Sequence, residues 1–231
     1  MARLREFAAF DFGPSADAAA CLGPTDVIDC DHPEVVRHAR ELTQACRTPL
    51  ERAQALFAWV RDEVPYNFTP MLPNRQAWSA SRSLVRRDGF CQQKAVLLAA
   101  LLRAVGIPAG LGFQHVRDHM LLDTRFEAHL PSGLILFHGC TMVHLDGVWR
   151  VADATLDRDL CHRRGYRLVE LAAQGDALLP ATDLRGTPHF DFIARYETYA
   201  DLPETVSDMF LKLAPVWSDM KRLVERTGAT M

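Results

Sequence analysis

The chain has 231 residues, of which 48% are hydrophobic and 24% are charged. These proportions are typical of a globular protein and exclude a disordered chain, a collagen-like chain and a coiled coil. There are 26 Lys and Arg against 29 Asp and Glu, and no basic tract, so we do not expect nucleic acid as the main partner. The length favours one large domain or one domain with an extension.

Helical signals dominate the first half of the chain. Residues 33–46 are predicted to form a short helix. The run Thr48-Pro49-Leu50-Glu51 is a capping box that opens a second helix, with proline in its first position and Pro65 at its end. We expect residues 66–88 to be mostly loop, because prolines and Asn74 interrupt them.

A more apolar helix is predicted from about Cys91 to Val105, buried on most sides and ended by Gly106-Ile107-Pro108. A last helix is expected over residues 203–227, which Pro215 should kink or split.

Strands are predicted between these helices. Residues 134–145 and 148–154 are rich in β-forming residues, and Asp146-Gly147 joins them, which is a strong hairpin signal. Helices first, strands next and helices last indicate an α+β fold.

The chain should lie in a reducing compartment. No long apolar run follows the charged residues at its start, so we expect no secretory signal. The apolar stretch 95–108 is interrupted by Arg103 and is too short to span a bilayer. We therefore expect a cytoplasmic protein with no membrane partner and with six free thiols: Cys21, Cys30, Cys46, Cys91, Cys140 and Cys161.

Cys91 is the strongest candidate for chemistry. It follows Gly89-Phe90 at the start of the buried helix, where free backbone N–H groups and the helix dipole stabilise a thiolate. Arg86 and Arg87 could add to this effect. The alternative is that Cys91 is one more small buried apolar residue, as most free cysteines are.

The hairpin suggests a partner for this thiol. With Asp146 and Gly147 as the central turn residues, the register places His138 opposite Thr155, and Asp153 becomes its diagonal neighbour. Diagonal Cβ atoms lie roughly 7 Å apart, within reach of an imidazole–carboxylate hydrogen bond. Such a carboxylate would orient the imidazole of a triad. The alternative is a polar pair on a solvated strand face.

Three segments resemble the transglutaminase-like superfamily. They are the cysteine helix from Gly89 to Ala109, the stretch from His138 to Thr155, and the upstream Trp59-Val60 and Pro65-Tyr66-Asn67. The resemblance covers roughly residues 50–157.

The resemblance implies a papain-like α+β fold, with N-terminal helices packed on an antiparallel sheet and a C-terminal helical extension. It implies one domain over residues 1–231, with a core at about 33–157 and the extension at 158–231. It also implies a catalytic triad of Cys91, His138 and Asp153, which would act on amide bonds without a cofactor.

A metal site is not expected. The family often has Trp and an acidic residue where this chain has Cys140 and Met142, which argues against the calcium-dependent transglutaminases, and no acidic calcium loop is present. His138, Cys140 and His144 alternate on one strand, but they span too far for one zinc shell.

The sequence leaves the second oxyanion donor open among several side chains. The backbone N–H of Cys91 is one donor, and four upstream or adjacent side chains could supply another: Tyr66, Asn67, Trp78 and Gln92. His115 and His119 are expected to flank a loop after the cysteine helix. They could line the cleft, although exposed loop histidines are the simpler interpretation.

These features predict a thiol-dependent acyl-transfer enzyme that acts on a peptide or small-molecule amide through a Cys91 thioester. Hydrolysis is the default outcome, because water is available unless the site excludes it. An amide-forming acyltransferase that passes the acyl group to an amine is the alternative. A non-catalytic binding domain on the same fold is the alternative from a different class. The oligomeric state is left open.

Overall fold

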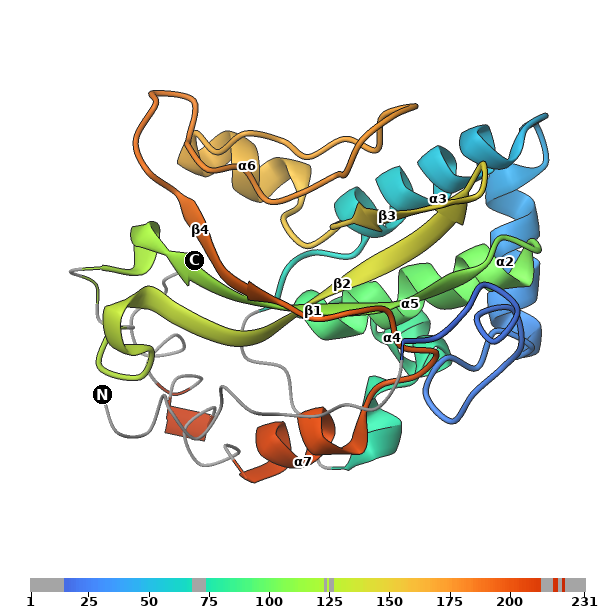
Figure 1. Ribbon diagram of the computed structural model, residues 1–231, viewed down its shortest axis with the longest axis horizontal. Helices are drawn as coiled ribbons and strands as arrows, with labels where there is room; N and C mark the ends of the chain where they lie inside the picture. Colours follow the sequence, from blue (N-terminus) through green and yellow to red (C-terminus); the bar gives the residue numbers. More distant parts are fainter. Residues whose placement is uncertain are drawn as a thin grey trace.

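Helices pack around a four-stranded antiparallel sheet in this protein (Figure 1). The computed structural model describes residues 15–67, 74–122, 124, 127–212, 218, 219 and 222. The predicted α+β class is confirmed. In chain order the elements are α2 (Pro33–Thr43), α3 (Pro49–Glu63), η1 (Arg75–Trp78), α4 (Ala80–Arg86), α5 (Cys91–Ala104), β1 (Ala109–Asp118), η2 (His119–Leu121), η3 (Pro131–Gly133), β2 (Leu134–Leu145), β3 (Val148–Ala152), α6 (Arg158–Arg164), β4 (Phe190–Arg195) and α7 (Glu204–Lys212).

The sheet has the strand order β3-β2-β1-β4. β2 and β3 form the predicted hairpin, with Leu145 paired to Val148. Asp146 and Gly147 have φ of 53° and 80°, as a two-residue type I′ turn requires. β3 ends at Ala152, two residues earlier than expected, because the next backbone N–H donates to a carbonyl in the segment after α6 instead of to β2.

The capping box at the start of α3 is confirmed. The hydroxyl of Thr48 accepts from the backbone N–H of Glu51 at 3.1 Å, and the Glu51 carboxylate accepts from the Thr48 N–H at 3.3 Å. Pro49 occupies the first helical position. The short helix predicted from residue 33 is also present and ends at Thr43.

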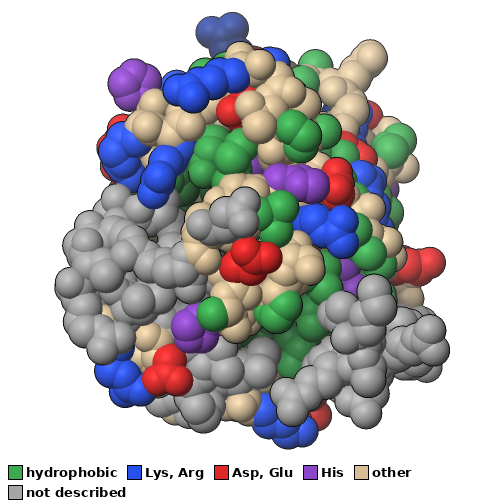
Figure 2. Space-filling model, turned by 90° about the vertical axis from the view of Figure 1, so that its left-hand side faces the viewer, with side chains coloured by type: hydrophobic (Ala, Val, Ile, Leu, Met, Phe, Trp, Pro, Cys, Tyr) green, Lys and Arg blue, Asp and Glu red, His purple; other side chains and the backbone are tan. Residues whose placement is uncertain are grey.

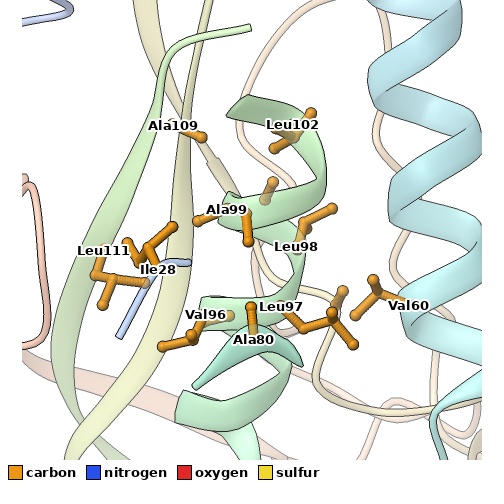
Figure 3. Packing of buried hydrophobic residues seen from close by; sticks show 14 of the residues in the cluster. Ile28, Val60, Ala80, Val96, Leu97, Leu98, Ala99, Leu102, Ala109 and Leu111 are labelled. Atoms are coloured by element: carbon orange, nitrogen blue, oxygen red, sulfur yellow. The ribbon is translucent and has the colours of Figure 1, made fainter. Parts of the chain in front are cut away.

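Helix α5 is the centre of the hydrophobic core. Every residue from Cys91 to Arg103 is buried, because the sheet covers one side of the helix and α2, α3 and α4 cover the others. In Figure 3 the α5 side chains lie between Leu111 of β1 and Val60 of α3. Deleting a buried leucine such as Leu98 in a core of this kind costs about 2–5 kcal/mol. The core therefore holds the start of α5 rigidly.

The expectation that residues 66–88 are mostly loop is wrong for their second half. This stretch contains η1 and α4, and α4 buries Ala80 and Leu84 against α5. The helix has only seven residues and no side-chain cap at its start, so its sequence carries little helical periodicity. It ends at Arg87, which has the left-handed conformation.

The expected loop around His115 is also wrong. His115 lies inside β1, buried, and His119 begins η2. β1 is buried along nearly its whole length, so it lacks the alternating pattern of a half-exposed strand, and Gly110 and Gly112 are weak strand formers.

The residues after 157 complete the fold. Strand β4 was not predicted, and it pairs with β1 as the fourth strand of the sheet. The predicted C-terminal helix begins as α7, but its continuation around Pro215 lies outside the described residues. No helix within the described part of the chain is long and apolar enough to cross a membrane.

Candidate active site

Cys91 is the first residue of α5. Phe90 before it is extended, and its N–H is met by the Gln93 side chain at 3.4 Å. The first intrahelical hydrogen bond runs from the Lys94 N–H to the Phe90 carbonyl at 3.0 Å. The N–H of Cys91 therefore lies in the first turn of the helix. It has no acceptor within the helix and can donate to an anion. The thiol lies deep in the site, since Cys91 is 4% exposed.

The predicted contact between His138 and Asp153 is present. Nε2 of His138 and Oδ2 of Asp153 are 2.7 Å apart, and both side chains are buried. The other carboxylate oxygen accepts from the Thr155 N–H at 3.1 Å, which fixes its orientation. Since Nε2 faces the carboxylate, Nδ1 is the ring nitrogen that can exchange a proton with a thiol.

Electrostatics favour a charged His138. Burial by itself lowers the pKa of this imidazole, but the charges of Asp153 and Cys91, together with hydrogen bonds to both, outweigh burial and raise the pKa to about 10. These interactions favour the imidazolium form of the ring, which lies next to a cysteine at a helix start. This arrangement can stabilise a thiolate nucleophile.

Irregularities in the backbone of β2 set the orientation of His138. The β1–β2 register shifts between Gln114 and Val116, so that β2 carries one extra residue immediately before His138. Phe137 has φ of 52°, an uncommon value for a bulky residue. His115 holds it in place, because its Nδ1 accepts the Phe137 N–H at 3.1 Å and the two rings make an edge contact at 4.6 Å.

Gln92 ties the cysteine helix to the histidine strand. Its amide Nε2 donates to the Phe137 carbonyl at 2.8 Å, and its Oε1 accepts from the Trp78 indole at 3.2 Å. Gly139 permits this approach, since a Cβ there would lie 2.7 Å from Cγ of Gln92. Sequence reasoning missed Gly139, although a glycine inside a strand often marks a close backbone approach.

The four oxyanion candidates have different surroundings. Trp78 and Gln92 hydrogen-bond each other, and the amide of Asn67 donates to Asp88 at 2.8 Å. Tyr66 pairs its backbone with Gly89, just before the nucleophile.

The Tyr66 hydroxyl lies in the site's electrostatic field. Burial raises its pKa well above the ordinary value, and the charges of Cys91, Asp118 and Asp153 raise it further. The hydroxyl therefore stays protonated and can donate a hydrogen bond.

Lys94 links the start of α5 to the end of α3, a role that the sequence analysis missed. Its side chain is 1% exposed, and its amine donates to the carbonyls of Arg61 and Val64 at 3.0 and 2.7 Å, at the end of α3. Burial lowers the pKa of Lys94 to about 7. The available signal was a lysine in the first turn of a helix that the sequence predicts to be buried on most sides.

The strand residues that alternate with His138 point to other partners. The Cys140 thiol contacts the Gly112 carbonyl at 3.6 Å, and the His144 ring packs on Trp149 at 5.1 Å. Within the described ranges, no three His, Cys, Asp or Glu side chains are grouped so as to hold a metal ion.

The fold is α+β, a cysteine begins a central helix, and a histidine on the adjoining sheet contacts a carboxylate that directly follows the neighbouring strand. This combination defines the class of papain-like and transglutaminase-like folds. The model of the transglutaminase-like superfamily matches residues 36–154, and the chain belongs to this superfamily. The superfamily includes cysteine proteases and acyltransferases. No curated protein matches the sequence.

Three solved structures resemble the chain at low identity. A candidate cysteine protease from Cytophaga hutchinsonii has a TM-score of 0.48 and 20% identity, over 80% of this chain and 55% of that one. A candidate protease from Parabacteroides distasonis has a TM-score of 0.37 and 17% identity, over 53% and 23% of the two chains. The arylamine N-acetyltransferase from Mycobacterium abscessus has a TM-score of 0.35 and 16% identity, over 58% and 46%. The chain thus spans about half the length of the first of these.

Proposed function

We propose that this protein is a thiol-dependent enzyme that breaks amide bonds through an acyl-cysteine intermediate. The observation that carries the proposal is the buried hydrogen bond of 2.7 Å between His138 and Asp153, on the ring whose charge is coupled to Cys91 at the start of α5. The substrate is a peptide or a small-molecule amide.

Each residue of the triad has one role. The Cys91 sulfur attacks the amide carbonyl as His138 holds the thiol proton, and Asp153 orients the imidazolium. His138 then gives this proton to the leaving nitrogen, the C–N bond breaks, and a thioester remains. Attack of water on the thioester releases a carboxylic acid and restores the thiol.

The developing oxyanion needs hydrogen-bond donors. The Cys91 N–H is one, because it lies before the first intrahelical hydrogen bond. We assign the second to the Tyr66 hydroxyl, because Tyr66 lines the same cavity as His138, and burial together with nearby negative charges raises the pKa of this hydroxyl and keeps it a donor. The Trp78 indole and the Gln92 amide hydrogen-bond to other groups, and the Asn67 amide donates to Asp88.

Hydrolysis is the default reaction. Transfer of the acyl group to an amine requires the site to exclude water or to bind the amine tightly. A non-catalytic binding domain is the alternative from another class. The buried pair of His138 and Asp153 argues against it, because burying charged groups is costly and a binding domain gains nothing from coupling them to a thiol.

Trapping the intermediate tests the proposal. The protein is incubated with a pool of peptides and small amides, quenched in acid, and measured by intact mass and peptide mapping. We expect an acyl mass on the Cys91 peptide that hydroxylamine removes, and none in Cys91→Ala. Amide turnover by Cys91→Ala at the wild-type rate would contradict the proposal.

A further inference from the structure

A cavity of about 100 Å³ lies next to His138. It sits where the end of β1 and the start of β2 face α6 and the segment that leads into β4, and its walls are mostly apolar. Four of the apolar residues that line it are Ile135, Leu156, Leu160 and Leu179. The volume fits a group the size of an aromatic ring or a branched side chain.

Polar side chains interrupt these apolar walls, among them Arg164, Thr155, Asp118 and His189. Asp118 closes β1, is 8% exposed, and uses one carboxylate oxygen to accept the Met120 N–H at 2.8 Å. His189 is 1% exposed, and neither of its ring nitrogens has a hydrogen-bond partner among the described residues. Its Nε2 lies 3.8 Å from Oδ1 of Asp118, too far for a hydrogen bond.

An unpartnered imidazole in an apolar cavity is unfavourable. A buried donor or acceptor without a partner costs about as much free energy as a lost hydrogen bond. Native proteins therefore rarely keep one without a role. Burial lowers the pKa of His189 to about 4, so the ring is neutral and offers one N–H donor and one acceptor. The His189 ring stacks on the Phe190 ring at 4.0 Å and packs at a tilt against the Tyr166 ring at 4.2 Å, and all three residues line the cavity.

A hydroxyl satisfies both groups at once. Asp118 can only accept when ionised, whereas neutral His189 can donate, and a hydroxyl both donates and accepts. A hydroxyl beside the 3.8 Å gap can reach each partner at an ordinary hydrogen-bond distance. An ammonium group could pair with the Asp118 carboxylate, but it can only donate and would leave the His189 N–H without an acceptor.

We propose that this cavity is a substrate-specificity pocket that binds an aromatic or branched apolar group carrying a hydroxyl at its tip, held between Asp118 and His189. This inference rests on the proposed function, because the pocket selects substrates for the same thiol.

The position of the pocket indicates which part of the substrate it binds. His138 lines it and Cys91 does not. In the proposed reaction His138 protonates the leaving nitrogen, so the group in the pocket is the one attached to that nitrogen. Figure 2 faces the end of the molecule where β4 and the β1–β2 connection lie, and shows histidine, acidic and basic side chains among hydrophobic ones there.

Two chloroacetamides that differ by one hydroxyl test the pocket. The reagents are N-[2-(4-hydroxyphenyl)ethyl]chloroacetamide and N-(2-phenylethyl)chloroacetamide. Each alkylates a thiol with loss of chloride and carries its ring on the amide nitrogen. The second-order rate of Cys91 alkylation is measured by intact mass and peptide mapping, and the ratio of the two rates is the readout. We expect about a tenfold preference for the hydroxyl reagent, the effect of one good hydrogen bond to a charged group.

Variants assign the preference to its residues. Asp118→Asn keeps an oxygen for the Met120 N–H but removes the charge, and His189→Phe keeps the ring and loses no described hydrogen bond. We expect either variant to bring the rate ratio below about threefold. Asp191→Asn is the control, because Asp191 is an exposed carboxylate of β4 that contacts His119. This variant should keep the tenfold ratio.

The outcomes separate the pocket from the chemistry. Plain iodoacetamide carries no ring and reports only whether Cys91 is the reactive thiol. If iodoacetamide prefers Cys91 but the two chloroacetamides react equally fast, the pocket is refuted and the proposed function stands. If the hydroxyl preference persists in His189→Phe and Asp118→Asn alike, the pocket is refuted as well. If no reagent prefers Cys91, the proposed function itself fails.

Discussion

Replacing Lys94 with methionine should remove a pH dependence of stability that the fold builds in. The amine is 1% exposed, and burial lowers its pKa to about 7, against about 10.4 in an unfolded chain. A difference of one pKa unit between the folded and unfolded chains changes the free energy of unfolding by about 1.4 kcal/mol. The full difference for Lys94 therefore corresponds to about 4–5 kcal/mol. Methionine has a similar volume and does not titrate.

The sign follows from proton counting. Between pH 7 and pH 10 the unfolded chain holds a proton on Lys94 and the folded chain does not. Unfolding therefore takes up a proton, and raising the pH stabilises the fold by up to about 1.4 kcal/mol per pH unit. Below pH 7 both states are protonated and the slope disappears. The variant also leaves the carbonyls of Arg61 and Val64 without their donor, a loss of about 1–3 kcal/mol that does not depend on pH.

Urea unfolding at pH 6, 7, 8 and 9 measures this effect. Thiol and phenol titrations are common to all proteins in the comparison, so the free-energy difference between wild type and Lys94→Met isolates Lys94. We expect that difference to favour wild type increasingly by about 1.4 kcal/mol per unit from pH 7 to pH 9. Lys212→Met, at the exposed end of α7, is the matched control and should run parallel to wild type. Parallel curves for Lys94→Met would refute the reasoning and show that the amine stays charged in the fold.

Three further substitutions probe the site. Cys91→Ala should abolish amide turnover with a native circular dichroism spectrum, and near-native rates would exclude a nucleophile at this position. Asp153→Asn should lower kcat by orders of magnitude, with ~10⁴ measured for the equivalent change in a serine protease, because the amide favours the wrong tautomer of His138; a rate within a few-fold of wild type would make Asp153 structural. Gln92→Ala should reduce the free energy of unfolding by about 2–4 kcal/mol, since it leaves the Phe137 carbonyl and a buried indole N–H unpaired, and urea unfolding with an unchanged midpoint would disprove that.

The parts of the fold that the sequence predicts well are those set by residues close together in the chain. The Asp146-Gly147 turn sets the hairpin register, and with it the approach of His138 to Asp153. The Thr48 capping box likewise fixes the start of α3 within four residues of chain. In each case neighbours in sequence decide the geometry.

The missed features depend on contacts between distant segments. β1 is identified only once α5 and two neighbouring strands cover it, because its burial hides the strand periodicity. Asp118 and His189 come from the end of β1 and the start of β4, and nothing near either residue in sequence indicates that they share a cavity. Gln92 was visible as a polar neighbour of Cys91, but its contact with Phe137 requires the folded sheet.

The remaining thiols provide internal controls for a test of the nucleophile. Burial raises the pKa of four of them, so they stay protonated and unreactive near neutral pH: Cys21, Cys30, Cys140 and Cys161. Cys46 is the most exposed of the six and is the fair competitor.

Limiting iodoacetamide near pH 6, followed by peptide mapping of the native protein, tests the central claim most directly. An ordinary thiol with a pKa of about 8.5 is about 0.3% ionised at this pH, whereas the proposed reaction requires a reactive thiolate at Cys91. We predict that Cys91 is alkylated at least about tenfold faster than the more exposed Cys46, and that His138→Ala removes most of this advantage. Labelling led by Cys46 or Cys140, or spread evenly over several cysteines, would contradict the account and return the protein to the binding-domain alternative.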